Sequence, residues 1–554
     1  MKIDKEAEKW VNKTLEGLTL KEKIGQLLLP ILSADSANPL TVGEMVEKYN
    51  IAGGHYFGGN KEQSFIFTEA LQAKAKIPLL ITGDLDRGGG DRIKEGTLFQ
   101  CQMALGAADS EDLAYKLGKA IAVENLAVGY NWTFSPIVDI CAIRDHLRLI
   151  ACVGEDPKQI ARITVAEIKG LQDNGMAACA KHFPGDGYDD RDQHITTSVN
   201  TLSEKEWWKK SGYTFQTAID SGVWTIMNSC IAMPAMDKEC GDPKNPRPVN
   251  ISRYMTTGIL REKMGFEGVI VTDALNMGGV AIHERRFERY LQSFEAGNDL
   301  LLFVFRVGET VAYFEKAVKE KRITEAQIDS SVRRVLTLKA KIGLHNKLTK
   351  EEKEKRLEVF KNSPFKKDAI ELAEKSITLL TDSRNIIPLK LKKGATIASV
   401  LITNRETEFN GSVFNDYLKK AGYKVVPILN PDAESMYSRV ENKEFDLVIT
   451  SLFFPVQWGW ITPRMHGPYV RSLMSGYYIA HPEVKSIFVS FDSPGRLYEI
   501  SAMDPFFATY GGSPFAQEAV AKAILGEIAV SGKAPVSLNG FFKAGDGLQR
   551  KKLK

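Results

Sequence analysis

Up to about residue 305, the chain alternates short apolar runs with longer amphipathic segments. Eight of these runs have the composition of β-strands: GQLLLP, GGHYF, PLLITGD, NWTFSPIVD, MAACAKHF, VWTIMNS, GVIVTD and NDLLLFV. The segments between them have helical periodicity, as over residues 110–127 and 157–175, and the second ends in Asn174-Gly175, a common helix stop. Eight strands alternating with helices predict an α/β fold, a (β/α)8 TIM-like barrel, with a doubly wound open sheet as the alternative.

Several of these runs end in a polar residue. These residues are Asp84, Asp139, the pair Lys181–His182, Asn228 and Asp273. In a barrel of this kind, the reacting groups stand at the carboxyl ends of the strands. Any one of the five positions is equally well explained as a cap of the following helix, but capping accounts poorly for all five together. The pattern therefore predicts a functional site at the carboxyl ends of the strands.

Beyond residue 305 the pattern changes. Residues 306–385 are helical and charged, which predicts closing helices followed by a connecting arm. A second α/β pattern then predicts a smaller domain with an open parallel sheet, from the apolar runs TIASVLIT, KVVPIL, FDLVITSLFF, KSIFVSF and PFFATYG. We expect three parts: a barrel domain over residues 1–345, connecting helices over 346–385, and a C-terminal α/β sandwich domain over 386–554.

Composition narrows the class of protein. The 554 residues are 44% hydrophobic and 26% charged, with a net charge of +4, so we expect a globular protein without a nucleic-acid partner. No apolar stretch reaches the roughly 18 residues that a spanning helix needs, and the charged N-terminus does not resemble a secretory signal. These features favour a cytoplasmic protein that does not bind a membrane. The six cysteines form no CxxC motif, so we expect reduced core thiols, and no ligand-spaced cluster predicts a metal or a cofactor.

Residues 181–194, KHFPGDGYDDRDQH, concentrate titratable groups next to an apolar run. Within them, Asp192 stands two residues before His194. A carboxylate that hydrogen-bonds one ring nitrogen fixes the tautomer and raises the basicity of the other, which makes such a pair a candidate proton donor. Taken alone, the pattern is more often a solvated loop.

Lys181 and His182 end the apolar run that precedes this loop. Their polar heads suit hydrogen bonding to sugar hydroxyls or to an anion. The alternative is a local ion pair with Asp186 or Asp189.

Two further stretches carry carboxylates. GVIVTDALNMGGV brings Asp273 into a glycine-flanked turn, where it is a candidate nucleophile, metal ligand or helix cap. A proton donor at His194 favours the nucleophile, because double displacement at a sugar carbon needs both groups. ITGDLDRGGGDR follows a strand with Asp84, and its glycines lack the spacing and the lysine of a phosphate-binding loop. Asp84 is therefore expected to bind adjacent sugar hydroxyls.

The stretch AKHFPGDG, the following Asp192-x-His194 and the stretch VIVTDALNM together resemble glycoside hydrolase family 3, and within it the bacterial β-N-acetylglucosaminidase branch. The resemblance covers nearly the whole chain, from LTLKEKIGQLLL to the late YGGSPFAQEAVAKAILGEIAVSGKAPVSL. It implies that Asp273 is the nucleophile and that His194 with Asp192 is the acid/base. It further implies that the sugar is bound by Asp84, Lys181, His182 and Arg92. In the β-glucosidase branch the acid is a glutamate of the second domain, so the dyad implies that this domain is not needed for proton transfer.

Sugar-recognition positions depart from the family pattern, although the catalytic pair is intact. Ala151 stands where the family's RSFGxDP-like segment has an arginine, and Arg144 and Arg148 are the nearby substitutes. Cys230 replaces the histidine of an AHI pattern, and the usual Asp-x-Glu turn becomes Asp84-Leu85-Asp86. These changes weaken the assignment of N-acetylglucosamine as the sugar.

The sequence thus predicts a retaining exo-β-glycosidase, first of all a β-N-acetylglucosaminidase, that acts on a small glycoside or oligosaccharide as a monomer or homodimer. One alternative is a glycosidase or phosphorylase of the same family with a different sugar, and another is a non-catalytic sugar-binding protein. A histidine acid repels phosphate less than a glutamate would, which keeps phosphorolysis open. The aglycone and the role of the second domain also stay open.

Overall fold

The computed structural model describes residues 1–33, 40–144, 149–242, 244–455, 459, 464–473 and 485–553. The chain forms two compact units. Unit 1 comprises Met1–Leu98, Ala114–Ile140 and Ile160–Phe365, and unit 2 comprises Phe99–Leu113, Cys141–Gln159 and Lys366–Lys554. Two short segments from the first third of the chain are therefore grouped with the C-terminal part.

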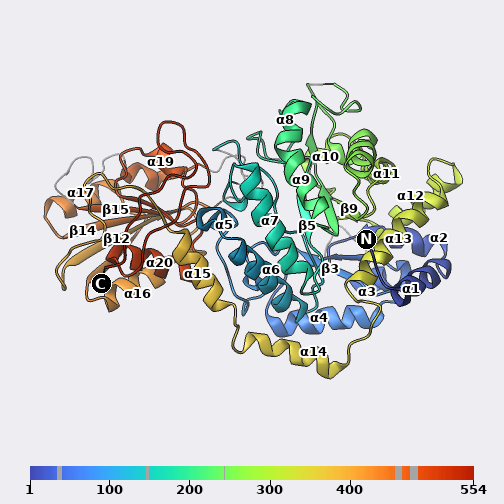
Figure 1. The fold of residues 1–554 in the computed structure, drawn as a ribbon, viewed down its shortest axis with the longest axis horizontal. Coiled ribbons are helices and arrows are strands. Elements are labelled where there is room, and N and C mark those ends of the chain that lie inside the picture. The colour runs from blue at the N-terminus through green and yellow to red at the C-terminus, as the bar shows by residue number, and fades with distance from the viewer. Residues whose placement is uncertain are drawn as a thin grey trace. The chain divides into compact units, whose positions relative to one another are not determined.

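Unit 1 is built around eight short strands (Figure 1). They are β1 (Leu28–Leu29), β2 (Gly53–His55), β3 (Leu80–Gly83), β4 (Trp132–Thr133), β5 (Cys179–Phe183), β7 (Thr225–Asn228), β9 (Val269–Thr272) and β10 (Leu301–Leu302). They pair in parallel as β1–β10, β2–β3–β4 and β5–β7–β9. Parallel bridges join these groups at Ile31–His55, Trp132–Ala177 and Val271–Leu300. Each strand is thus linked to two others, and we call the closed set the eight-strand ring.

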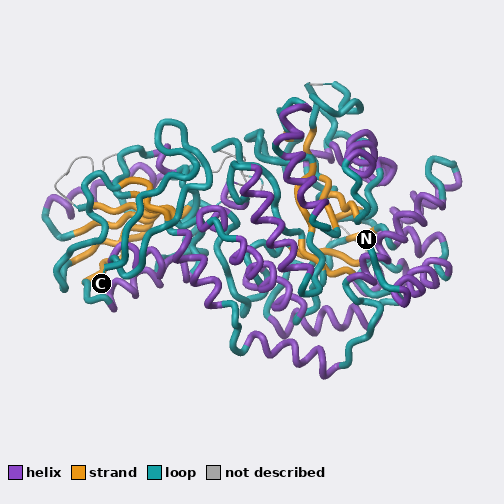
Figure 2. The backbone as a smooth tube through the Cα atoms, viewed as in Figure 1, coloured by secondary structure: helices purple, strands orange, loops and turns teal. Residues whose placement is uncertain are grey.

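Each of the eight apolar runs in the sequence contains one of these strands. All the strand residues are buried, which explains why the runs are continuously apolar rather than alternating. Helices surround the strands (Figure 2). Most of the helical residues of unit 1 lie in α1 (Lys5–Glu16), α2 (Leu20–Gly25), α3 (Val42–Tyr49), α4 (Lys61–Lys74), α6 (Glu111–Leu126), α7 (Pro157–Gln172), α8 (Glu204–Lys209), α9 (Ser211–Asp220), the π-helix η4 (Tyr254–Lys263), α10 (Gly278–Ala281), α11 (Arg286–Ala296), α12 (Val307–Lys319), α13 (Glu325–Lys341) and α14 (Lys350–Arg356).

Unit 2 contains a six-stranded sheet in the order β11-β16-β15-β14-β12-β13. The strands are β11 (Thr378–Thr381), β12 (Thr396–Thr403), β13 (Lys424–Leu429), β14 (Leu447–Phe453), β15 (Ser486–Ser490) and β16 (Phe506–Ala508). Five of them are parallel, as the sequence predicts, but the edge strand β11 runs antiparallel to β16. Its residues lie in the stretch assigned from the sequence to the connecting arm, and they pair with the sheet because Leu379 is buried in its core.

Unit 2 also contains helices (Figure 1). They are α5 (Met103–Ala108), α15 (Lys366–Ser376), α16 (Ser412–Lys420), α17 (Ala433–Glu441), α19 (Arg496–Glu499) and α20 (Pro514–Leu525). Five of the six cysteines are buried, as expected for core thiols, and Cys101 is half-buried. Among the described helices, none combines the length and the apolar character needed to cross a membrane.

Candidate active site

The polar residues predicted from the strand ends do gather at one edge of the eight-strand ring. Asp84 follows β3, Lys181 and His182 lie at the end of β5, and Asp273 follows β9. Because all strands of the ring are parallel, their carboxyl ends open on the same side. The prediction of a common site at these ends is therefore consistent with the topology.

Asp273 has one satisfied and one unsatisfied carboxylate oxygen. The backbone N–H of Ala274 donates to Oδ1 at 2.7 Å, and the N–H of Asp273 donates to the carbonyl of Asn228 at 2.7 Å. Oδ2 has no hydrogen-bond partner, although the atom is buried and the residue is only 7% exposed. The backbone thus holds the carboxylate in place while one oxygen remains available to a ligand.

His194 and Asp192 form the pair that the sequence predicts. His194 Nδ1 lies 2.7 Å from Asp192 Oδ1, which also accepts the backbone N–H of His194 at 2.9 Å. The Asp192 side chain is fully buried, whereas that of His194 is 26% exposed. The carboxylate therefore binds Nδ1 and orients the ring.

The loop that carries His194 lies against the turn that follows Asp273. The N–H of Gly278 donates to the carbonyl of His194 at 2.8 Å, and the N–H of Gly279 donates to the carbonyl of Gln193 at 3.0 Å. These bonds hold the loop of the candidate acid against the turn that follows the candidate nucleophile.

Lys181 lies at the centre of a second cluster. Its Nζ is 3.0 Å from Asp84 Oδ1 and 3.5 Å from Asp86 Oδ2, and the side chain is 2% exposed. Arg92 Nη2 lies 3.6 Å from Asp84 Oδ2. Burial acts to raise the pKa of Asp84, but the neighbouring positive groups, Lys181 first, outweigh it and hold this pKa well below its usual range. Asp84 is therefore an ionised acceptor suited to sugar hydroxyls.

The second carboxylate of this turn behaves differently. Burial raises the pKa of Asp86; Lys181 opposes this rise and the Asp84 charge adds to it. Since the two carboxylates share one lysine, the arrangement favours keeping a single full negative charge beside it.

His182 pairs with Asp139 rather than with its neighbours in sequence. Its Nδ1 lies 2.7 Å from Asp139 Oδ2, and its backbone N–H donates to Oδ1 at 3.0 Å. The alternative of a local ion pair with Asp186 or Asp189 is thus not what forms, because the strand ends bring Asp139 closer. The peptide bond between Lys181 and His182 is cis.

His55, at the end of β2, was not predicted as part of the site. It is 1% exposed, both of its ring nitrogens lack a hydrogen bond, and Nε2 lies 3.9 Å from Asp84 Oδ2. The rings of Phe57, Phe134 and Phe303 pack around it. Burial lowers the pKa of His55 to about 4, against the opposing charge of Asp84. A histidine inside the run GGHYF is the only signal for it in the sequence.

The three departures from the family pattern fall in different places. Cys230 is buried beside the site: Asn250 Nδ2 lies 3.4 Å from its Sγ, and burial together with the Asp273 charge raises its pKa well above the usual value. Ala151 belongs to unit 2, within the 3₁₀ turn η2 (Leu149–Ala151). Asp86 is the residue that shares Lys181 with Asp84.

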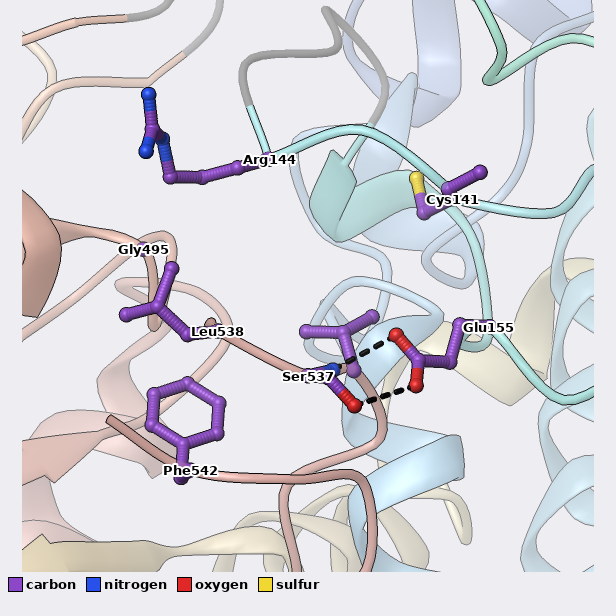
Figure 3. A pocket seen from close by; sticks show the side chains of 9 residues that line it. Cys141, Arg144, Glu155, Gly495, Ser537, Leu538 and Phe542 are labelled. Carbon is purple, nitrogen blue, oxygen red and sulfur yellow. Dashed lines mark hydrogen bonds between the residues drawn. The ribbon is translucent and has the colours of Figure 1, made fainter. Parts of the chain in front are cut away.

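Of the two arginines considered as substitutes for the missing one, Arg148 lies outside the described residues. Arg144 lies in unit 2, and its guanidinium stacks over the ring of Tyr498 at 3.5 Å from the centroid. Figure 3 shows it lining a small pocket in which the backbone N–H and the hydroxyl of Ser537 donate to Glu155. Its guanidinium is thus engaged by residues of unit 2.

Comparisons with known proteins identify the family of the chain. Residues 19–338 match the glycosyl hydrolase family 3 N terminal domain, so the chain belongs to that family. A beta-N-acetylglucosaminidase/beta-glucosidase of Cellulomonas fimi is 29% identical over 549 residues, which cover 96% of each chain.

Two solved structures are similar over both units. One is the beta-glucoside phosphorylase BglX bound to 2FGlc, with a TM-score of 0.87, 29% identity and 97% of each chain covered. The other is a glycoside hydrolase family 3 beta-N-acetylglucosaminidase from Paenibacillus sp. str. FPU-7, with a TM-score of 0.80, 27% identity, and coverage of 94% of this chain and 99% of that one. The protein is a glycoside hydrolase.

Proposed function

We propose that the protein is a retaining exo-β-glycosidase that forms a covalent glycosyl-enzyme on Asp273, and that its first substrate class is terminal β-N-acetylglucosaminides. In this proposal the eight-strand ring is a (β/α)8 barrel that carries the catalytic residues, and the C-terminal part, from about residue 386, is an α/β sandwich domain. The observation that carries the proposal is the buried, unpartnered Asp273 Oδ2 beside the loop of the Asp192–His194 pair.

Two chemical steps follow from these groups. In the first, Asp273 Oδ2 attacks the anomeric carbon while His194 Nε2 gives its proton to the departing glycosidic oxygen. In the second, the same nitrogen takes a proton from water, whose oxygen displaces Asp273, and the sugar leaves with retained configuration. Asp192 stabilises the imidazolium that exists before the first step and forms again in the second.

The remaining polar groups bind the sugar. Asp84 accepts from sugar hydroxyls, while Lys181 and Arg92 hold its carboxylate in place. His182, oriented by Asp139, has its Nε2 directed away from that carboxylate and can bond a further hydroxyl. The acetamido specificity rests on likeness to the acetylglucosaminidase relatives, since Cys230 and Ala151 replace expected sugar contacts.

Nitrophenyl glycosides test this assignment. We expect turnover of the β-N-acetylglucosaminide to exceed that of the β-glucoside and β-galactoside. We also expect His194→Ala to lower kcat/KM for alkyl glycosides by about 100-fold or more, but kcat/KM for nitrophenyl glycosides far less, because kcat/KM reports the first step and only the alkoxide needs a proton to depart. Equal losses on both substrates would remove His194 from the role of acid, and turnover of β-glucoside alone would reassign the sugar.

Phosphorolysis is the second candidate. It is favoured by a proton donor that adds no negative charge beside the glycosyl ester, and by the overall similarity to a protein named as a beta-glucoside phosphorylase. Here a phosphate oxygen attacks the anomeric carbon, the ester bond to Asp273 breaks, and a glycosyl phosphate is released. Initial rates with and without inorganic phosphate, together with product analysis, distinguish it from hydrolysis.

A further inference from the structure

The loop that carries His194 is attached to the turn after Asp273 by more than the two backbone bonds already described. The hydroxyl of Thr197 donates to the carbonyl of Gly279 at 2.7 Å. We call this set of bonds, formed by Gln193, His194 and Thr197 with Gly278 and Gly279, the inter-loop contact. Two of its three bonds join main-chain groups. The third is made by a side chain, the buried hydroxyl of Thr197.

The two glycines are required by the closeness of the loops. A Cβ on Gly278 would lie 2.0 Å from the carbonyl oxygen of Ile195, and a Cβ on Gly279 would lie 2.9 Å from the carbonyl oxygens of Gln193 and Cys230. Neither position has room for a side chain unless the backbone of the His194 loop moves. The loops therefore touch through their main chains, and any change at these positions displaces the proton donor.

The Thr197 hydroxyl is held from a second side. His283 Nε2 lies 2.7 Å from Thr197 Oγ1. A hydroxyl has one proton, and that proton goes to the carbonyl of Gly279, so Oγ1 must accept from the N–H of His283. Burial, with the charge of Arg247, lowers the pKa of His283, which is consistent with a neutral ring in this role.

The position of this contact matters for the chemistry. The turn from Asp192 to Thr197 is internally rigid, because the carbonyl of Asp192 accepts the N–H groups of Ile195 and Thr196 at 2.9 and 3.0 Å. A rigid turn can still move as a body. Double displacement depends on the separation between the acid and the nucleophile, and misplacement by about 1 Å costs on the order of 100-fold in rate.

We propose that Thr197 is a positioning residue for the proton donor: by bonding Gly279 it sets the location of the His194 turn relative to Asp273. Thr197 has no direct part in bond making or breaking. The inference rests on the proposed function, in which His194 is the acid and Asp273 the nucleophile. It goes further because it identifies what holds these two groups in register.

Replacing Thr197 by valine tests the proposal, because valine keeps the shape of the side chain and removes the hydroxyl. We expect Thr197→Val to lower kcat/KM about 10-fold for an alkyl glycoside of the accepted sugar and to change the 2,4-dinitrophenyl glycoside less than about 2-fold. Thr197→Ser, which retains the hydroxyl, should restore the alkyl activity. Thr196→Val is the matched control: this half-exposed neighbour takes no part in the inter-loop contact, and its activity on both substrates should be unchanged.

A general loss of folded protein would lower the apparent kcat/KM for both substrates by the same factor. The ratio of the two values therefore separates an effect on positioning from an effect on stability. Equal losses on both substrates, or no loss on either, would overturn the role of Thr197. If Thr197→Val does not fold, Thr197→Ala is judged by the same ratio. His194→Ala is measured alongside. If its loss of activity does not depend on the leaving group, the proposed function itself fails. If His194→Ala shows that dependence and Thr197→Val does not, only this inference fails.

Discussion

Both units place buried carboxylates and a buried cation at the carboxyl ends of parallel strands, but they satisfy these groups differently. In unit 2, Arg496 Nε lies 2.9 Å from Asp492 Oδ1, and its Nη1 lies 2.8 Å from Glu499 Oε1. The main chain of Phe454 completes the set: its N–H donates to Asp492, and its carbonyl accepts from Arg496. We call these groups the Arg496 cluster.

The edge of the eight-strand ring retains polar atoms without partners. Asp273 Oδ2, Asp86 Oδ1 and both ring nitrogens of His55 are buried and form no hydrogen bond. Burying a polar atom without a partner is unfavourable, typically by about 1–3 kcal/mol, so a group of such atoms at one edge is a candidate ligand contact. The comparison teaches that a buried charged cluster indicates function when its bonds are incomplete and structure when they are complete.

The largest effect expected from this difference is on turnover. Asp273→Asn keeps an oxygen to accept from the Ala274 N–H but removes the nucleophile, so we expect kcat to fall by about 10⁴-fold or more. The thermal unfolding temperature should change little, because Oδ2 makes no bond in the folded protein. Steady-state rates and calorimetry measure the two quantities. Turnover within 10-fold of the unaltered protein would exclude Asp273 as the nucleophile.

The Arg496 cluster should respond in the opposite way. Arg496→Met leaves Asp492 buried without its cation, so we expect a loss of about 3–5 kcal/mol in the free energy of unfolding of unit 2. Arg439→Met is the matched control, because Arg439 pairs with Glu444 at the surface and contributes at most about 1 kcal/mol. Calorimetry on the full chain gives the comparison. Equal stability of the two variants would mean that the cluster does not stabilise unit 2.

The strands of the eight-strand ring were predictable because each lies in a short, buried apolar run, and such runs are visible in the sequence. In unit 2 the apolar runs were visible too, even for the edge strand β13, whose residues are exposed or half-buried. The runs TIASVLIT and KVVPIL correspond to the full extents of β12 and β13. The antiparallel direction of β11 was not visible, since the direction of an edge strand depends on its partner in space. The grouping of residues 141–159 with unit 2 was hidden for the same reason.

Within the site, the Asp192–His194 pair was predictable from its spacing of two residues. The partner of His182 was not: Asp139 lies 43 positions away and reaches it only through the ring. His55 was missed because a single histidine in an apolar run usually belongs to the core. Thr197 carries no sequence signal, since its role depends on the close approach of two loops.

His55 gives a prediction on pH that the Arg496 cluster does not share. Its folded pKa of about 4 lies below the ordinary value of 6.5, so the unfolded chain binds a proton first as the pH falls. This group therefore stabilises the fold above pH 6.5, and that contribution, about 3 kcal/mol, is lost between pH 6.5 and 4. His55→Leu should reduce the loss of stability of unit 1 over this range, as measured by urea unfolding at several pH values. An unchanged pH dependence would show that the imidazole is not held neutral.

The smallest effect is expected when the same isosteric change, Asp to Asn, is made at the edge of the eight-strand ring and in the Arg496 cluster. In Asp84→Asn, Lys181 keeps Asp86 at 3.5 Å, so the fold should tolerate the variant, while the loss of an ionised acceptor raises KM by about 10–100-fold. Asp492→Asn makes the same chemical change in unit 2, where Arg496 and the Phe454 N–H both use the carboxylate. It should therefore lower stability and leave the KM of the folded enzyme unchanged. Initial rates and calorimetry on both variants decide the matter. If Asp84→Asn destabilised the protein as much as Asp492→Asn and left KM unchanged, Asp84 would be a structural ion-pair residue like Asp492, and the incomplete bonds at the ring edge would not mark a sugar site.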